Sequence, residues 1–216
     1  MDELALGKSR LIKYKLLDGQ KHEGALLLPP DYQEGQRVPV IVDLYDDGAG
    51  TRLNYFGLGK EYGQILASRG YAMFFPGLPL QDSDPMRQLP GLVLPAVNQL
   101  IELGIADPDR LGLIGDSYGG YLTLALLTQT RMFRAAVAIA GMVNWTSMYG
   151  SLTNYGESFG VNFCEDGEEG GRMGASIWNQ RERFIENGPA NRVQSLPLVG
   201  SSSSKNISAE ELGKHS

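Results

Sequence analysis

The sequence contains one cysteine and two histidines in 216 residues, so it is poor in the side chains that build metal and redox sites. A single thiol, Cys164, excludes an internal disulfide. With so few histidines and no phosphate-binding glycine loop, no ligand set for a metal or a nucleotide is present, and we expect no cofactor. Acidic neighbours raise the pKa of a thiol, which predicts a passive role for Cys164.

Long apolar runs and an excess of positive charge are also missing. No stretch of about 18 apolar residues and no charged-then-apolar leader occurs, which predicts no membrane partner and, by default, a cytoplasmic location. The formal net charge of -6 opposes binding to nucleic acid, because the long-range field repels polyanions. The content of 42% hydrophobic and 20% charged residues is typical of a globular domain.

What the sequence does contain is a Gly-x-Ser-x-Gly motif at residues 115–119. An apolar strand-like run precedes it at 111–114, and a helix-like apolar run follows at 122–127. This strand-turn-helix setting is the one that a nucleophile elbow requires, and the two glycines leave room where strand and helix nearly touch. Ser117 is therefore the predicted nucleophile; the alternative is an ordinary helix N-cap serine.

Strands and helices alternate along the rest of the chain. Strand signals fall at residues 10–17 and 21–28, which form a hairpin, and at 38–45, 71–75 and 135–140. Helical patterns fall at 59–69 and 92–103. This order predicts an α/β fold with a mostly parallel sheet flanked by helices, and ligands bound at the carboxyl ends of the strands.

The segment Gly-Asp-Ser-Tyr-Gly-Gly-Tyr at 115–121, together with Asp-Pro-Asp-Arg-Leu-Gly at 107–112, resembles the prolyl oligopeptidase family of serine peptidases. The family includes dipeptidyl peptidases and acylaminoacyl peptidases, and the resemblance extends from about residue 10 to 199. It implies an α/β-hydrolase domain over residues 1–200, followed by a serine run and a short helix or tail at 201–216. It also implies acyl transfer through Ser117 on peptide or small acyl substrates.

The same resemblance implies further site residues. Tyr45 matches a tyrosine whose hydroxyl helps to hold the oxyanion together with the backbone N–H of Tyr118. Trp145 and Tyr149 match the region that walls the pocket for the residue before the scissile bond, and Asn206 matches a substrate-binding position. Tyr45 is equally explained as a rim or core aromatic, and Trp145 and Tyr149 as ordinary packing.

Two observations oppose full activity. Asp46 and Asp47 stand where the family has glycines, and their carboxylates would oppose negative charge at an oxyanion site. Ser204 stands where the family carries the aspartate of its catalytic triad, and the family histidine comes after a further strand and helix, beyond Ser216. We interpret His215 as a surface residue. The expectation is a C-terminally truncated domain with impaired catalysis.

Two other functions remain open at this stage. The chain could be a noncatalytic fragment or pseudoenzyme that keeps the fold for binding, or an esterase acting on small esters. Because the last strand and helix of the fold are expected to be missing, an unpaired sheet edge near Leu198 would favour self-association.

Overall fold

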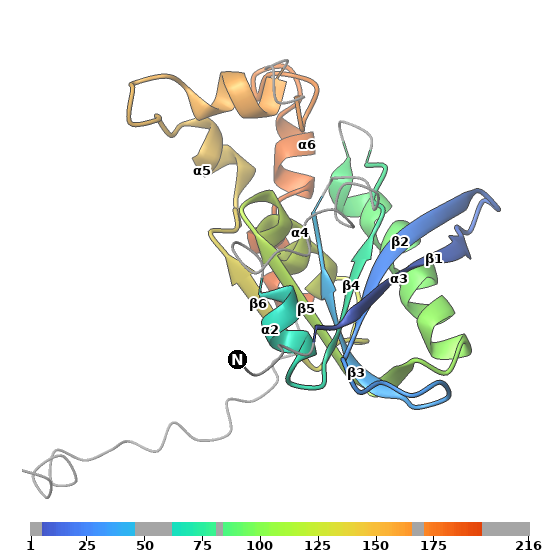
Figure 1. Cartoon of the computed structure of the whole chain (residues 1–216). Helices are drawn as coiled ribbons and strands as arrows, with labels where there is room; N and C mark the ends of the chain where they lie inside the picture. The colour runs from blue at the N-terminus through green and yellow to red at the C-terminus, as the bar shows by residue number, and fades with distance from the viewer. Residues whose placement is uncertain (1–5, 46–61, 81–83, 166–170, 196–216) are drawn as a thin grey trace, which may run out of the picture.

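The structure, a computed structural model, describes residues 6–45, 62–80, 84–165 and 171–195. Within them, six strands form one sheet in the order β1-β2-β4-β3-β5-β6 (Figure 1). The strands are β1 (Lys8–Lys15), β2 (Lys21–Leu28), β3 (Val38–Asp43), β4 (Ala72–Pro76), β5 (Ala106–Asp116) and β6 (Ala135–Ile139). The helices are α2 (Gly63–Ala67), α3 (Pro85–Glu102), α4 (Tyr118–Leu127), α5 (Trp145–Tyr149), the π-helix η1 (Gly160–Glu165), α6 (Arg181–Glu186) and the 3-10 helix η2 (Pro189–Ser195).

The sheet is mixed, as predicted, with an antiparallel hairpin ahead of a parallel core. β1 and β2 pair antiparallel, and β2 pairs antiparallel with β4, whereas β3, β4, β5 and β6 are parallel. The hairpin turn has Gly19 at φ 85°, a conformation that glycine adopts without steric cost. The Gln20 N–H donates to the Asp18 carboxylate at 2.9 Å, which closes the turn.

Helices cover both faces of the sheet. Leu26 and Phe74 belong to the larger core cluster, which also holds the buried residues of α3 and α4. Their neighbours Leu27 and Met73 point to the opposite face and pack with Ala67 of α2 in a second cluster. This alternation along β2 and β4 is the two-residue period of strands buried on both faces.

Helix α3 begins earlier than the pattern at 92–103 predicts. Its N-cap is Asp84, whose carboxylate accepts a hydrogen bond from the Arg87 N–H at 3.3 Å. Pro90 lies inside the helix and has no N–H to offer the Met86 carbonyl four residues earlier. The side chain of Gln129, just past the C-terminal end of α4, donates to that carbonyl at 2.9 Å. This hydrogen bond replaces the one that Pro90 cannot make.

Strands β5 and β6 also differ from expectation. β5 starts at Ala106, and its register against β3 shifts, which accommodates residues 107–110 as a bulge with mostly exposed side chains. β6, predicted as a buried strand, is exposed at all five residues because it is the edge strand of the described sheet. Leu198, where the open edge was expected, and the boundary at residue 200 lie outside the described residues.

Candidate active site

Ser117 lies in a sharp turn between β5 and α4. It has φ 55° and ψ -116°, a positive φ that residues other than glycine rarely adopt. Its N–H donates to the Ile139 carbonyl at 2.9 Å, and its own carbonyl accepts from the Tyr121 N–H at 3.2 Å. The residue is exposed just after the carboxyl end of β5, an interior strand of the sheet. The predicted strand-turn-helix geometry is confirmed, and such turns hold strain of about 1–3 kcal/mol.

The turn is possible because backbones approach one another closely around it. A Cβ on Gly115 would lie 2.2 Å from the Gly119 carbonyl oxygen, and one on Gly119 would lie 2.0 Å from the Leu44 carbonyl oxygen. Neither distance can accommodate a side chain, so both glycines of the motif are sterically required. Gly120 and Gly141 form a further close pair, which the motif alone does not reveal.

Tyr45 stands beside the elbow. It lies two residues after the end of β3, is half-buried and packs against the larger core cluster. A ring carbon of Tyr45 lies 3.3 Å from the position that a Cβ on Gly119 would take, so the ring borders the first turn of α4. Its role as an oxyanion donor stays a prediction. Asp46 and Asp47 lie outside the described residues.

Tyr118 is the first residue of α4, so its N–H lies at the amino-terminal end of that helix. That group belongs to the positive end of the helix dipole, immediately after the nucleophile. An anion that develops on an acyl group bound to Ser117 would therefore be near a backbone donor, as the elbow pattern predicts. The side chain of Tyr118 points inward and is 2% exposed.

Trp145 and Tyr149, the predicted pocket aromatics, lie on α5 in different environments. Trp145 is fully buried and packs edge-on against Tyr121 at 5.0 Å between ring centroids. Tyr149 is half-buried; its hydroxyl donates to the Glu165 carboxylate, and this hydrogen bond raises the pKa of the phenol. Tyr149 also meets Phe184 of α6 edge-on at 5.5 Å. Direct substrate contact by either ring stays a prediction, and Trp145 has no exposed surface for it.

The other sequence candidates separate into described and undescribed residues. Cys164 is buried. Its burial, and to a smaller extent the charge of Glu165, raises the pKa of the thiol to about 12. His22, the one histidine among the described residues, lies on β2 and stacks with Tyr14 at 6.2 Å. Asn206, Ser204 and His215 lie outside the described residues. The part of the chain that the structure describes holds no group of three or more metal-ligating side chains.

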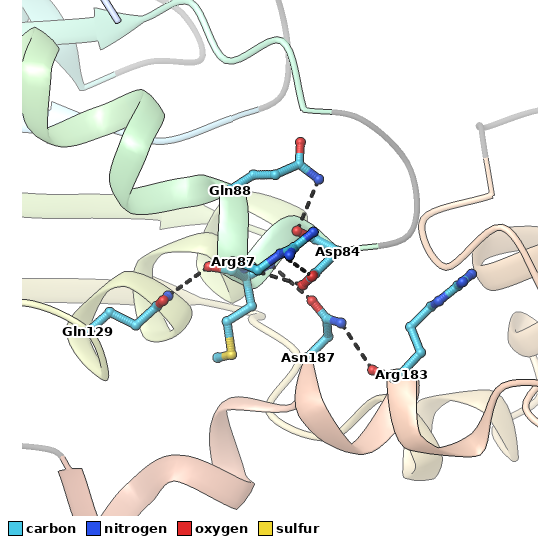
Figure 2. Close-up of polar contacts among 7 residues, drawn as sticks. Asp84, Arg87, Gln88, Gln129, Arg183 and Asn187 are labelled. Atoms are coloured by element: carbon cyan, nitrogen blue, oxygen red, sulfur yellow. Dashed lines mark hydrogen bonds and ion pairs between the residues drawn. The ribbon is translucent and has the colours of Figure 1, made fainter. Parts of the chain in front are cut away.

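A network around Asn187 is a feature that the sequence motifs did not identify (Figure 2). Asn187 is 1% exposed and ends α6; its side-chain oxygen accepts from the Met86 N–H at 3.0 Å. Its side-chain nitrogen donates to the Arg183 carbonyl at 3.0 Å. One amide thus fastens the end of α6 to the start of α3. The signal in the sequence is Glu-Asn-Gly-Pro at 186–189, a turn that resembles one in the family.

After β6 the chain leaves the sheet, and the described residues of this excursion, 141–165 and 171–188, contain α5, η1 and α6. Figure 1 shows α5 and α6 together at one end of the molecule, beyond α4. Asn187 fastens the excursion to α3, and the Ala190 N–H, which donates to the Val143 carbonyl at 2.9 Å, brings its two ends together. No helix in the described ranges is long and apolar enough to cross a bilayer.

Comparison with known proteins agrees with this geometry. Residues 93–186 match the model of the prolyl oligopeptidase family. YuxL of Bacillus subtilis, an uncharacterized peptidase, is 30% identical over 151 residues, which cover 64% of this chain and 22% of that protein. Dipeptidyl peptidase 8 of Mus musculus is 29% identical over 180 residues, which cover 74% of this chain and 19% of that protein.

The solved acylaminoacyl peptidase of Pyrococcus horikoshii superposes with a TM-score of 0.66 at 22% identity, over 90% of this chain and 31% of that one. Such a likeness establishes the α/β-hydrolase fold. The chain spans about a fifth of the length of the two curated relatives. Together, the elbow, the fold and the match of residues 93–186 show an α/β-hydrolase domain that is similar to the serine peptidases of the prolyl oligopeptidase family.

Proposed function

We propose that Ser117 is the nucleophile of an acyl transfer on peptide bonds. The observation that carries this proposal is the exposed serine at φ 55° between β5 and α4, beside Tyr45 and the N–H of Tyr118. The serine oxygen bonds to the acyl carbon, the oxyanion is held by the Tyr118 N–H and the Tyr45 hydroxyl, and the C–N bond breaks. The amine leaves with the serine proton, and water then hydrolyses the ester. Tyr149 and Asn206 are proposed to contact the acyl side of the substrate, whereas the fully buried Trp145 is not.

The proton transfer needs a base, and we expect this chain to have no efficient one. Its two histidines are His22, which lies on the hairpin, and His215 in the tail, and Ser204 stands where the family has an aspartate. Loss of the histidine from such a site lowers turnover by on the order of 10⁶, leaving oxyanion and binding effects. We therefore propose low intrinsic reactivity. The low histidine count is also the observation that favours the second candidate, a noncatalytic domain that binds without turnover.

Labelling with a fluorophosphonate probe, read out by intact mass, tests the proposal. Ser117→Ala should abolish the adduct, whereas Ser151→Ala, at another exposed serine, should not change it. Slow labelling at Ser117 would support an acyl-transfer site, and cleavage of peptide against ester substrates would then separate a peptidase from an esterase. A folded protein with no adduct would overturn the catalytic proposal and leave the noncatalytic one.

We also propose that the chain self-associates through an exposed sheet edge. The five residues of β6 are all exposed and apolar, including Val137 at 52% and Ile139 at 39%. Among the described strands β6 is an edge strand, and such an edge offers backbone groups to a second chain. Sedimentation velocity should show a concentration-dependent dimer that Val137→Lys weakens. Equal behaviour of the wild type and Val137→Lys would contradict this role of β6.

A further inference from the structure

Four aromatic rings pack beneath the nucleophile turn. Tyr118 stacks on Tyr121 with 5.4 Å between centroids and meets Trp145 and Phe163 edge-on at 6.4 and 6.0 Å. Trp145 in turn stacks on Phe163 at 6.1 Å. The rings come from α4, α5 and η1, so the side chain that follows Ser117 is held by two elements of the excursion. Each such pair stabilises the packing beyond the burial of its apolar area.

Arg172 closes this cluster. Its Cζ lies 4.2 Å from the centroid of Tyr118 and 5.6 Å from that of Phe163, so the guanidinium contacts both rings. The backbone around it is fixed as well: the Arg172 N–H donates to the Phe163 carbonyl at 3.1 Å, and the Met173 N–H donates to the Cys164 carbonyl at 2.9 Å. Arg172 is half-buried, and partial removal from water strengthens the attraction between a cation and an aromatic face.

The place of Tyr118 gives this contact a function. Its backbone N–H is the proposed oxyanion donor, and it adjoins a serine whose φ of 55° is strained. A strained turn persists only where the surrounding packing holds it. The inward-facing ring of Tyr118 is the nearest anchor for that turn, because the ring and the N–H belong to the same residue. Arg172 is the cationic partner of this anchor.

We propose that Arg172 is a positioning residue, which orients the Tyr118 N–H toward the oxyanion by holding the Tyr118 ring. This inference rests on the proposed acyl transfer at Ser117. It predicts that Arg172 affects the reactivity of Ser117 through Tyr118. Loss of a whole oxyanion donor costs about 10²–10³ in rate, so loosening one should cost less, about tenfold.

The experiment measures the rate of fluorophosphonate labelling at Ser117. Arg172→Met, which keeps an unbranched side chain without the charge, should label about tenfold more slowly, and Arg172→Lys should restore part of the rate. Arg181→Met removes an exposed arginine from the start of α6 and should leave the rate unchanged. In a Tyr118→Leu background, Arg172→Met should have no further effect. An unchanged rate in Arg172→Met, or a full effect that persists without the Tyr118 ring, would overturn the proposal.

A second readout keeps this proposal separate from the catalytic one and does not require the Tyr118→Leu protein to fold. With ¹⁵N-tyrosine labelling, the Tyr118 amide resonance should shift in Arg172→Met and stay in place in Arg181→Met. If the wild type is not labelled at Ser117, the catalytic proposal fails, and a shifted Tyr118 amide still supports Arg172 as its positioning residue. An amide resonance that does not move would overturn the role of Arg172 whatever the labelling shows.

Discussion

At the scale of single residues, the nucleophile turn depends on glycines, because there is no room in it for a Cβ atom. Gly119 lies in the first turn of α4, where the helix presses on the backbone at Leu44. The opposing group is a carbonyl oxygen, which cannot rotate away as a flexible side chain would. Any side chain at this position must therefore move either β3 or α4, and both elements carry parts of the proposed site.

Gly119→Ala should strongly destabilise the domain. The added Cβ would lie 2.0 Å from the Leu44 oxygen, so we expect a loss of about 3 kcal/mol or more in the free energy of unfolding. Gly91→Ala is the matched control, because Gly91 lies inside α3 with no atom within 4 Å of the new Cβ. Alanine there should raise stability by about 0.5–1 kcal/mol. Urea unfolding of the two variants checks both values; equal stabilities would contradict the packing argument.

Tyr14 gives the fold a dependence on alkaline pH. Its side chain is 3% exposed, its hydroxyl donates to the Gly77 carbonyl at 3.1 Å, and burial raises the pKa of the phenol from 10.0 to about 12. Because the unfolded phenol ionises first, the stabilisation is complete below pH 10. It is lost as the pH rises from 10 to 12, by about 2 kcal/mol.

Tyr14→Phe tests this dependence. The variant cannot ionise at this position, so its stability should fall less steeply between pH 10 and 12 than that of the wild type. At pH 8 it should be less stable by about 1 kcal/mol, because the hydrogen bond to Gly77 is lost. Thermal melts across this pH range provide the measurement. Parallel stability curves for the two proteins would show that the pKa of Tyr14 is the same in the folded and unfolded states, which would contradict the prediction.

At the scale of elements, Asn187 and Gln129 compensate for an unusual helix. Both backbone groups of Met86 bind side chains from elsewhere: its N–H donates to Asn187, and its carbonyl accepts from Gln129 (Figure 2). The first group is a helix-start N–H and the second is the carbonyl that Pro90 cannot serve. Side chains that follow α6 and α4 therefore supply both missing partners of Met86 in this proline-containing helix.

Asn187→Ala should destabilise the domain by about 1–3 kcal/mol, because it leaves the buried Met86 N–H without an acceptor. Amide exchange of Met86 should accelerate by more than that of other α3 amides. Asn191→Ala is the matched control, since Asn191 is exposed and its amide donates to the Ile185 carbonyl at 2.7 Å. We expect it to cost less than Asn187→Ala. A Met86 amide that stays equally protected in both variants would refute the role of Asn187.

The elements also show what the sequence could predict. The hairpin, β3, β4 and the elbow follow from local signals, namely turn residues, apolar runs and the glycine spacing around Ser117. The start of α3 was missed because Pro90 is a helix breaker, and its partner Gln129 is distant in sequence. The sequence does not predict the exposure of β6, because an apolar strand has the same pattern whether or not another segment packs on it.

The candidate site shows the same division. Ser117 and its strained turn could be placed from sequence, because the motif encodes local geometry. Arg172 and the burial of Trp145 could not, because they depend on contacts between the excursion and α4 that no spacing rule describes. The tertiary partners of a residue follow from packing, which a single sequence does not display.

At the scale of the whole molecule, the excursion and the sheet share one hydrophobic core. Trp145, Cys164, Met173 and Phe184 of the excursion belong to the same buried cluster as the residues of β3 and α4. Segments that bury side chains in a common core lose their packing together, so we expect them to unfold as one cooperative unit. The excursion would then be part of the hydrolase domain rather than an appended lid.

The two tryptophans make this testable, because Trp145 is fully buried and Trp178 is 85% exposed. In Trp178→Phe, fluorescence reports on Trp145 alone, and its urea midpoint should coincide with that from far-UV circular dichroism. Trp145→Phe is the matched control: emission from Trp178 should change little on unfolding, since that ring is already in water. A Trp145 transition at lower urea than the loss of secondary structure would mean that the excursion opens separately. In that case the aromatic cluster beneath Ser117 would disassemble before the sheet, and the strained turn would lose the packing that maintains it.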